Sequence, residues 1–243
     1  MLEKYTHIIF SDGAALGNPG PGGWGTVVIL SKKLITELGG YEEHTTNNRM
    51  EIMALLMGLR RIEGERGDVL CCTDSQYVIN AVTKWLHGWK KNGWKTTTKQ
   101  PVLHRELFEE IDARIDAHKK HGAVHFQYVP GHVGVSGNER CDTIATSFAR
   151  KDDPELYNGK LSDYAIDILN VGIDPTAMEK KDSIKKRSGP AYSYLSLVDG
   201  KVKRHKTWAE CEARVKGKPG VKYKKALTEA EEEAILKSWG VKL

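Results

Sequence analysis

Four acidic residues give the sequence its strongest chemical signal. They are Asp12 in FSDGAALGNPG, Glu51 in TTNNRMEIMA, Asp74 in CCTDSQYV and Asp142 in GNERCDTIA. Carboxylate oxygens are the ligands that hard divalent cations such as Mg²⁺ prefer, and two such cations can support an in-line displacement at phosphorus. A single acid in such a place is most often a helix cap or a solvated surface group. The metal-site interpretation therefore depends on all four carboxylates meeting in space.

The hydrophobic pattern predicts the elements that hold these acids. They are a strand over residues 5–12 (Asp12), a helix over 49–62 (Glu51), a strand over 69–73 (Asp74) and a helix over 138–150 (Asp142). Further strands are expected over residues 24–30, 34–41 and 124–129, further helices over 75–82 and 101–119, and a Gly/Pro loop over 17–25. Each acid is thus expected near the end of a buried strand or within a helix of the same folded region.

The composition indicates a globular protein outside the membrane. The chain has 243 residues, of which 40% are hydrophobic and 28% charged, and its mean hydropathy is -0.48. No apolar run approaches membrane-spanning length, and the first ten residues lack the apolar core of a signal peptide. We therefore expect a cytoplasmic protein with no membrane partner. The four cysteines lack the paired spacing of a zinc site and are expected to be buried, reduced thiols.

The positive charge is concentrated near the end of the sequence. Residues 191–243 contain 12 Lys and Arg but only seven Asp and Glu, so their net charge of +5 equals that of the whole chain. Two strands over residues 192–198 and 201–205 and helices over 208–215 and 228–238 are expected there. A basic, aromatic-containing module favours a polyanion as partner, although a solvated lysine-rich surface is the alternative.

Tryptophans and lysines alternate in the segment KWLHGWKKNGWKTTTK. Trp85 and Trp94, with Lys90 and Lys91 between them, are interpreted as a contact to a nucleic-acid strand, because aromatic rings and cations together suit such a strand. Simple packing of the tryptophans within this segment is the alternative.

The first 150 residues closely resemble bacterial type 1 ribonuclease H. The motifs that carry the resemblance are DGAALGNPGPGGWG, TTNNRMEIMA, TDSQYV, WLHGWKKNGWKT and GHVGVSGNERCDTIA. The resemblance implies an α/β, RNase H-like fold with a five-stranded mixed sheet flanked by helices. It implies an endonuclease that hydrolyses the RNA strand of RNA–DNA hybrids with two Mg²⁺ ions, for which Mn²⁺ substitutes, leaving 5′-phosphate and 3′-hydroxyl ends.

The same resemblance assigns roles to individual residues. Asp12, Glu51, Asp74 and Asp142 correspond to the metal-binding carboxylates, and His132 to a loop histidine that assists proton transfer or product release. Asn18, Asn47 and Gln76 correspond to residues that contact 2′-hydroxyls, and Thr46 with Asn18 to a pocket for a DNA phosphate.

The end of the sequence resembles a hybrid-binding, viroplasmin-like domain, a small α+β module. The resemblance implies that Tyr194, Trp208, Tyr223, Lys224 and Lys225 contact nucleic acid, although Trp208 as a core residue is an alternative. The expected domains are a catalytic domain over residues 1–152, a partly ordered linker over 153–190 and a nucleic-acid-binding domain over 191–243. The expected partner is an RNA–DNA hybrid, or double-stranded RNA at the last domain, bound by a monomer.

Two other functions are compatible with parts of the sequence. One is a nuclease of the same fold class that cuts DNA, which cleavage of an all-DNA duplex would reveal. The other is a catalytically inactive hybrid-binding scaffold, which a metal-dependent product ladder would exclude.

Overall fold

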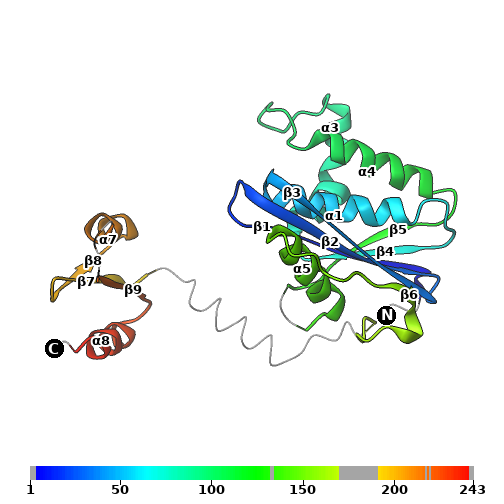
Figure 1. Ribbon diagram of the computed structural model, residues 1–243. Helices are drawn as coiled ribbons and strands as arrows, with labels where there is room; N and C mark the ends of the chain where they lie inside the picture. The colour runs from blue at the N-terminus through cyan, green and yellow to red at the C-terminus, as the bar shows by residue number, and fades with distance from the viewer. Residues whose placement is uncertain (1–3, 132–133, 170–190, 217, 219, 241–243) are drawn as a thin grey trace. The chain divides into compact units, whose positions relative to one another are not determined.

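The computed structural model describes residues 4–131, 134–169, 191–216, 218 and 220–240 (Figure 1). The chain divides into two compact units, Met1–Ala177 and Met178–Leu243, which we call the N-terminal unit and the C-terminal unit. Residues 170–190, most of the expected linker, lie outside the described residues. Within the described residues no helix is both long enough and apolar enough to cross a membrane.

A six-stranded mixed sheet forms the centre of the N-terminal unit. Its strands are β1 (His7–Ala15), β2 (Gly20–Leu30), β3 (Leu34–Thr45), β4 (Val69–Thr73), β5 (Val124–Tyr128) and β6 (Asn158–Lys160), in the order β5-β4-β1-β2-β3-β6. The β1, β4 and β5 strands run parallel, whereas β2, β3 and β6 pair antiparallel with their neighbours. Parallel strands place their carboxyl ends at the same edge, so the ends of β1 and β4 lie next to each other.

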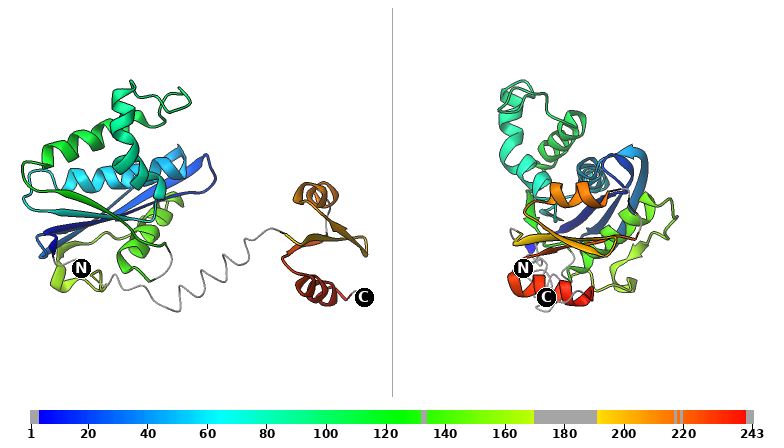
Figure 2. Two further views of the ribbon diagram at one scale, coloured as in Figure 1. Left: turned by 180° about the vertical axis from the view of Figure 1, so that it is seen from behind. Right: turned by 90° about the vertical axis from the view of Figure 1, so that its left-hand side faces the viewer.

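Helices cover both faces of this sheet (Figures 1 and 2). The helical segments are α1 (Asn47–Arg61), α2 (Gln76–Asn80), the π-helical turn η2 (Ala81–Trp85), α3 (Leu86–Lys91), α4 (Arg105–His118), α5 (Ser136–Ala149) and the 3-10 turn η3 (Leu161–Asp163). One core packs α1 and α4 against the sheet, and the second packs α5 and residues 156–168 against the opposite face. The expected α/β fold with a mixed sheet between helices is therefore confirmed.

Three local predictions for this unit need correction. The sheet has a sixth strand, β6, because three polar and glycine residues pair with the edge of β3; so short a segment has no hydrophobic pattern to predict it. The β2 strand begins at Gly20, since residues 20–25 continue the pairing with β1 and β3. Helical structure continues from Gln76 to Lys91 instead of ending at residue 82.

The C-terminal unit is a small α+β module. Its elements are β7 (Ser193–Val198), β8 (Lys201–His205), α7 (Trp208–Val215), β9 (Lys222–Ala226) and α8 (Glu229–Ser238). The expected hairpin of β7 and β8 is confirmed, and β9 pairs with the other edge of β7 in an antiparallel sheet. We did not predict β9, because its lysines hide the alternation typical of a strand. All four cysteines are buried free thiols, as expected.

Candidate active site

The acidic residues Asp12 and Glu51 are brought together by the contact between β1 and α1. Asp12 is buried in β1, with 7% of its surface exposed, and Glu51 lies in the second turn of α1. Gly13 permits this contact, because a Cβ atom there would lie 2.2 Å from the Glu51 backbone nitrogen. The strand therefore passes directly against the helix that carries the second acid.

The electrostatics of Asp12 indicate that the other three acids lie within reach of its charge. Burial and then the negative charge of Asp74 raise the pKa of Asp12 to about 8, with further contributions from Asp142 and Glu51. The Gly13 amide, which donates to Asp12 Oδ1 at 2.7 Å, opposes this shift. Among the described residues, the charged groups that shift this pKa are all acidic. The fold thus gathers negative charge around Asp12.

Glu51 is held in place by two side chains. Asn47 Nδ2 donates to Glu51 Oε1 at 2.9 Å, and Ser75 Oγ donates to Glu51 Oε2 at 2.5 Å. Burial raises the pKa of Glu51, the two hydrogen bonds oppose that shift, and the charge of Asp74 adds to it. The role of Ser75 as a partner of Glu51 was not predicted, because its position in sequence indicates only the N-cap of α2, a role it also has.

The other two acids come from the end of β4 and from α5. Asp74 directly follows β4, and a Cβ atom on Gly131 would lie 2.0 Å from Asp74 Oδ2, so the segment after β5 packs on this carboxylate. Asp142 is half-buried on α5 and accepts a hydrogen bond from Thr146 Oγ1 at 3.4 Å. His132, the expected loop histidine, lies outside the described residues.

The donor atoms of this cluster suit a hard divalent cation. All four side chains offer carboxylate oxygens, and a bound cation would relieve the repulsion that raises the Asp12 pKa. In the described parts of the chain, no three His, Cys, Asp or Glu side chains already have the close spacing of a formed metal site. Like charges repel each other, so the carboxylates are expected to come closer together when a cation lies between them. The chemistry of the carboxylate oxygens, and not their spacing, therefore supports a divalent cation at this site.

The predicted substrate residues surround the same edge. Thr46 caps α1 by accepting a hydrogen bond from the Arg49 amide at 3.3 Å, and Asn47 contacts Glu51. Gln76 is exposed two residues after Asp74. Asn18 is exposed in the turn before Gly20, and the pairing of Gly20 with Thr45 brings this turn close to Thr46. Asn47 therefore contacts the acidic cluster directly, and Thr46 and Gln76 lie next in sequence or nearly so to residues of the cluster or of its contacts.

The tryptophans of the segment after α2 pack on one another and on α4. The rings of Trp85 and Trp89 lie 5.8 Å apart, and Trp89 packs on Phe108 at 5.3 Å. Trp94 is partly buried, with the Arg105 guanidinium 5.5 Å from its ring. Trp85 remains 39% exposed. Packing thus accounts for much of this aromatic cluster, and Trp85 keeps the most accessible face.

The lysines of this segment differ in their surroundings. Lys90 Nζ lies 2.5 Å from Asp112 Oδ2 of α4, so part of its charge is neutralised. Lys91 is exposed at the end of α3.

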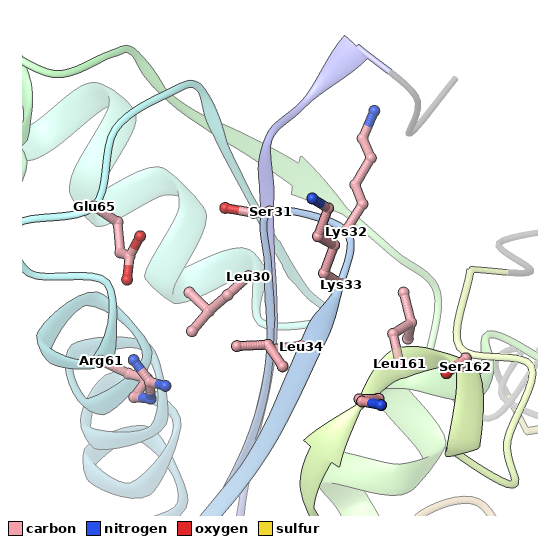
Figure 3. Close-up of a pocket in the computed structure, with 10 residues that line it drawn as sticks. Leu30, Ser31, Lys32, Lys33, Leu34, Arg61, Glu65, Leu161 and Ser162 are labelled. Atoms are coloured by element: carbon pink, nitrogen blue, oxygen red, sulfur yellow. The ribbon is translucent and has the colours of Figure 1, made fainter.

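A groove of about 830 Å³ lies at the other end of the N-terminal unit (Figure 3). Leu30 and Leu34 lie between Arg61 of α1 and Leu161. Glu51 and Arg61 are ten residues apart on α1, which corresponds to roughly 15 Å along the helix axis. The groove is therefore separate from the acidic cluster.

An aromatic cluster lies on one face of the C-terminal sheet. The Trp208 ring is 5.9 Å from Tyr194 and 5.6 Å from Tyr223, and Trp208 is 42% exposed, so the alternative that it is a core residue is wrong. The β9 strand alternates its faces. Because Tyr194 pairs with Lys225, Lys225 shares the aromatic face. Lys224, predicted to contact nucleic acid as well, pairs with the core residue Leu195 and therefore lies on the face opposite the aromatic cluster.

A mixed sheet between helices, with acids from β1, α1, β4 and α5 at one edge, defines a protein of the RNase H-like fold class. A model of the RNase H family matches residues 4–150, so the chain belongs to the RNase H family. The family depends in general on divalent metal ions.

Individual relatives agree with this membership. Ribonuclease H of Thermosynechococcus vestitus is 46% identical over 149 residues, covering 60% of this chain and 91% of the relative. Ribonuclease H of a Bradyrhizobium species is 48% identical over 145 residues, covering 60% of this chain and 90% of the relative. Such relatives confirm the expected enzyme class, a ribonuclease H.

Solved structures share the fold. A type 1 RNase H with the type 2 active-site motif superimposes with a TM-score of 0.55 at 26% identity, covering 69% of this chain and 84% of that protein. A foamy viral protease-reverse transcriptase, solved in complex with dsDNA, superimposes with a TM-score of 0.54 at 23% identity, covering 62% of this chain and 98% of that chain, and supports the fold alone.

Proposed function

We propose that this protein is an endonuclease that hydrolyses the RNA strand of RNA–DNA hybrids at the Asp12 cluster. The observation that supports this most is the pKa of Asp12, raised to about 8 by burial and by three neighbouring acids. Strongly shifted acids are typical of functional sites. Two divalent ions, Mg²⁺ or alternatively Mn²⁺, would be held by the carboxylates of Asp12, Glu51, Asp74 and Asp142. When bound, these ions would neutralise the negative charge that develops at phosphorus.

The protein groups around the cluster orient the carboxylates. The Gly13 amide holds one oxygen of Asp12, while Asn47 and Ser75 each hold one oxygen of Glu51. His132 is assigned the transfer of a proton near the scissile phosphate, because the pKa of histidine suits exchange near neutral pH. Products with 5′-phosphate and 3′-hydroxyl ends are expected.

Selectivity for a hybrid requires contacts to both strands. The amides of Asn18, Asn47 and Gln76 both donate and accept, so they suit 2′-hydroxyls of the RNA strand. Thr46 and Asn18 are assigned to a phosphate of the DNA strand. Trp85, Trp94, Lys90 and Lys91 extend this DNA contact, with Trp85 and Lys91 offering the exposed groups.

The C-terminal unit is proposed as a hybrid-binding domain that also accepts double-stranded RNA. Tyr194, Trp208 and Tyr223 form an aromatic row, with Lys225 on the same face for phosphates. Residues 1–152, 153–190 and 191–243 are then the catalytic domain, the linker and the binding domain. Residues 153–169 of that linker are part of the N-terminal unit, where they contribute to its sheet and core. One chain would act as a monomer, with the C-terminal unit raising the local concentration of substrate.

Cleavage of matched substrates tests the activity. We expect Mg²⁺-dependent cleavage of an RNA–DNA hybrid, none of an all-DNA duplex, and poor cleavage of a DNA duplex with one ribonucleotide but efficient cleavage with a run of about four. Cleavage of the all-DNA duplex would indicate a different nuclease of this fold class, and binding without cleavage would indicate a scaffold.

A pair of adjacent substitutions tests the C-terminal unit. Tyr223→Ala in the full chain is expected to weaken hybrid binding by about tenfold, the lower range for one aromatic stacking contact, with kcat unchanged. Lys224→Ala is the matched control, because its side chain lies on the opposite face of β9. Equal affinities of the two variants for a hybrid would contradict the proposed face.

A further inference from the structure

The α5 helix is anchored to the sheet by a buried carboxylate outside the acidic cluster. Glu37 of β3 has a fully buried side chain, with 0% exposure. Arg140 of α5 donates to both of its oxygens, from Nε to Oε1 and from Nη2 to Oε2, each at 2.7 Å. The Tyr157 amide donates to Oε2 at 2.9 Å, and the Tyr164 hydroxyl donates to Oε1. The two carboxylate oxygens of Glu37 thus accept two hydrogen bonds each.

Two of these partners come from residues beyond the family match, which ends at residue 150. The segment 155–164 is tied to the same network by its backbone. Arg140 Nη2 donates to the Glu155 carbonyl at 3.0 Å, and the Glu37 amide donates to the Tyr157 carbonyl at 2.8 Å. The network therefore joins β3, α5 and this additional segment.

The position of Arg140 on α5 gives this network control over the rotation of the helix. Successive helical residues differ by about 100°, so Arg140 and Asp142 lie about 200° apart around the axis. Cys141, between them, is buried against the sheet. Arg140 and Asp142 therefore flank the buried side of α5, and rotation about the helix axis that loosened the Arg140 contact would move Asp142.

Close packing makes the helix sensitive to this anchor. A Cβ atom on Gly25 would lie 2.3 Å from the Cys141 carbonyl oxygen, so α5 rests directly on β2. Gly25 pairs with Asp12. This contact fixes the height of α5 above Asp12, so side-chain contacts at the flanks of the helix, such as that of Arg140, bear mainly on its rotation.

We propose that Glu37, Arg140 and Tyr164 are positioning residues that hold Asp142 toward Asp12 and thereby set the affinity of the acidic cluster for divalent cations. The proposal rests on the proposed function only in taking Asp142 as a cation ligand. It gives residues 155–164 a part in the active site, which they exert through Arg140 of α5.

Two tyrosines of the same segment provide a matched test in the full-length protein. Tyr164→Phe removes one hydrogen bond to Glu37. Tyr157→Phe removes a hydroxyl that donates to the Lys160 carbonyl at 2.9 Å and leaves the Tyr157 amide bonded to Glu37. Mn²⁺ binding without substrate is measured by calorimetry, and hybrid cleavage is measured across a Mn²⁺ series.

We expect Tyr164→Phe to weaken Mn²⁺ binding by a few-fold. This is less than the about 10–100-fold expected for a group bonded directly to a metal ligand, because Tyr164 acts on Asp142 through Glu37 and Arg140. Cleavage at saturating Mn²⁺ should remain near that of the unchanged protein, and Tyr157→Phe should leave both measurements unchanged. Arg140→Lys, which keeps the charge but loses the two-pronged contact, should weaken Mn²⁺ binding further; it provides the test if Tyr164→Phe does not fold.

Unchanged Mn²⁺ binding in folded Tyr164→Phe and Arg140→Lys, with a lower melting temperature, would overturn the proposal, because the network would then be only structural. Asp142→Asn separates this result from a failure of the proposed function. If Asp142→Asn also leaves Mn²⁺ binding unchanged, the assignment of the metal ligands is wrong.

Discussion

Two buried carboxylates of the N-terminal unit have opposite electrostatics. Asp12 lies among three other acids, and burial followed by the charge of Asp74 raises its pKa to about 8. Burial alone would also raise the pKa of Glu37, but hydrogen bonds from Arg140, Tyr164 and the Tyr157 amide lower it instead. Both acids lie on the side of the sheet that α5 covers or borders.

The difference separates a functional site from a structural one. A buried acid with a full set of donors and an arginine holds parts of the fold together. A buried acid surrounded by other acids destabilises the fold, and such an arrangement persists where a ligand or a reaction requires it. The two regions should therefore respond in opposite ways to loss of the negative charge.

Asp12→Asn should have the largest effect on activity and should not cost stability. We expect hybrid cleavage to fall by more than about a thousandfold, the size expected when charge stabilisation of a transition state is removed. The melting temperature at pH 8 without divalent ions should rise, because repulsion from Asp74 is relieved. Asp153→Asn, at an exposed position of the same unit, is the control for both measurements. Activity close to normal in Asp12→Asn would show that the Asp12 cluster is not the active site.

Glu37→Gln should reduce stability strongly. Removing one partner of a buried ion pair costs about 3–5 kcal/mol, because Arg140 loses its charged acceptor. Calorimetric melting at pH 7 should show a decrease of roughly 6–20 °C for this unit. A melting temperature equal to that of the unchanged protein would mean that Glu37 is not a structural anchor.

The two acids should also give opposite pH dependence of stability. The pKa of Asp12 is raised in the folded state, so the native protein holds its proton more tightly, and stability is lost as the pH rises from about 4 to about 8. The pKa of Glu37 is lowered, so its contribution is present above its ordinary value of 4.5 and is lost as the pH falls below it.

Melting curves from pH 3 to pH 9 without divalent ions check these signs. Asp12→Asn should flatten the decline between pH 4 and pH 8, and Glu37→Gln should differ from the unchanged protein least in acid. The reverse pattern would contradict the assignment of Asp12 to a functional site and of Glu37 to a structural one.

Glu232 of the C-terminal unit extends the comparison to a third buried acid and should show the smallest effect. It is bonded to Ser193 and Arg204, and these hydrogen bonds lower its pKa against the effect of burial. Arg204 has 57% of its side chain exposed, so water screens this pair. Glu232→Gln should therefore reduce the free energy of unfolding of the C-terminal unit by less than Glu37→Gln reduces that of the N-terminal unit. If calorimetry showed a larger loss of unfolding free energy for Glu232→Gln, the exposure of Arg204 would not weaken the contribution of this ion pair.

The amino-acid sequence by itself determined much of the fold and the identity of the acids. Strong hydrophobic patterns predicted β1, β4, α1 and α5, and each acid lies in its predicted element or, for Asp74, directly after it. These patterns are local, because apolar periodicity is set within a few turns or strand repeats. The expected clustering of the acids came from motif resemblance, and the pKa of Asp12 now supports it independently.

Only the tertiary structure decided the partners of those elements. Glu37 meets Arg140 across 103 residues and Tyr164 across 127, and no spacing in the sequence indicates either contact. The short strand β6 exists because it completes hydrogen bonds at the edge of β3, and β9 exists because it pairs with β7. The opposite faces of Lys224 and Lys225 follow from the register of that pairing. Long-range pairing and strand register depend on which surfaces meet after folding, and this is why local pattern and residue type could not determine them.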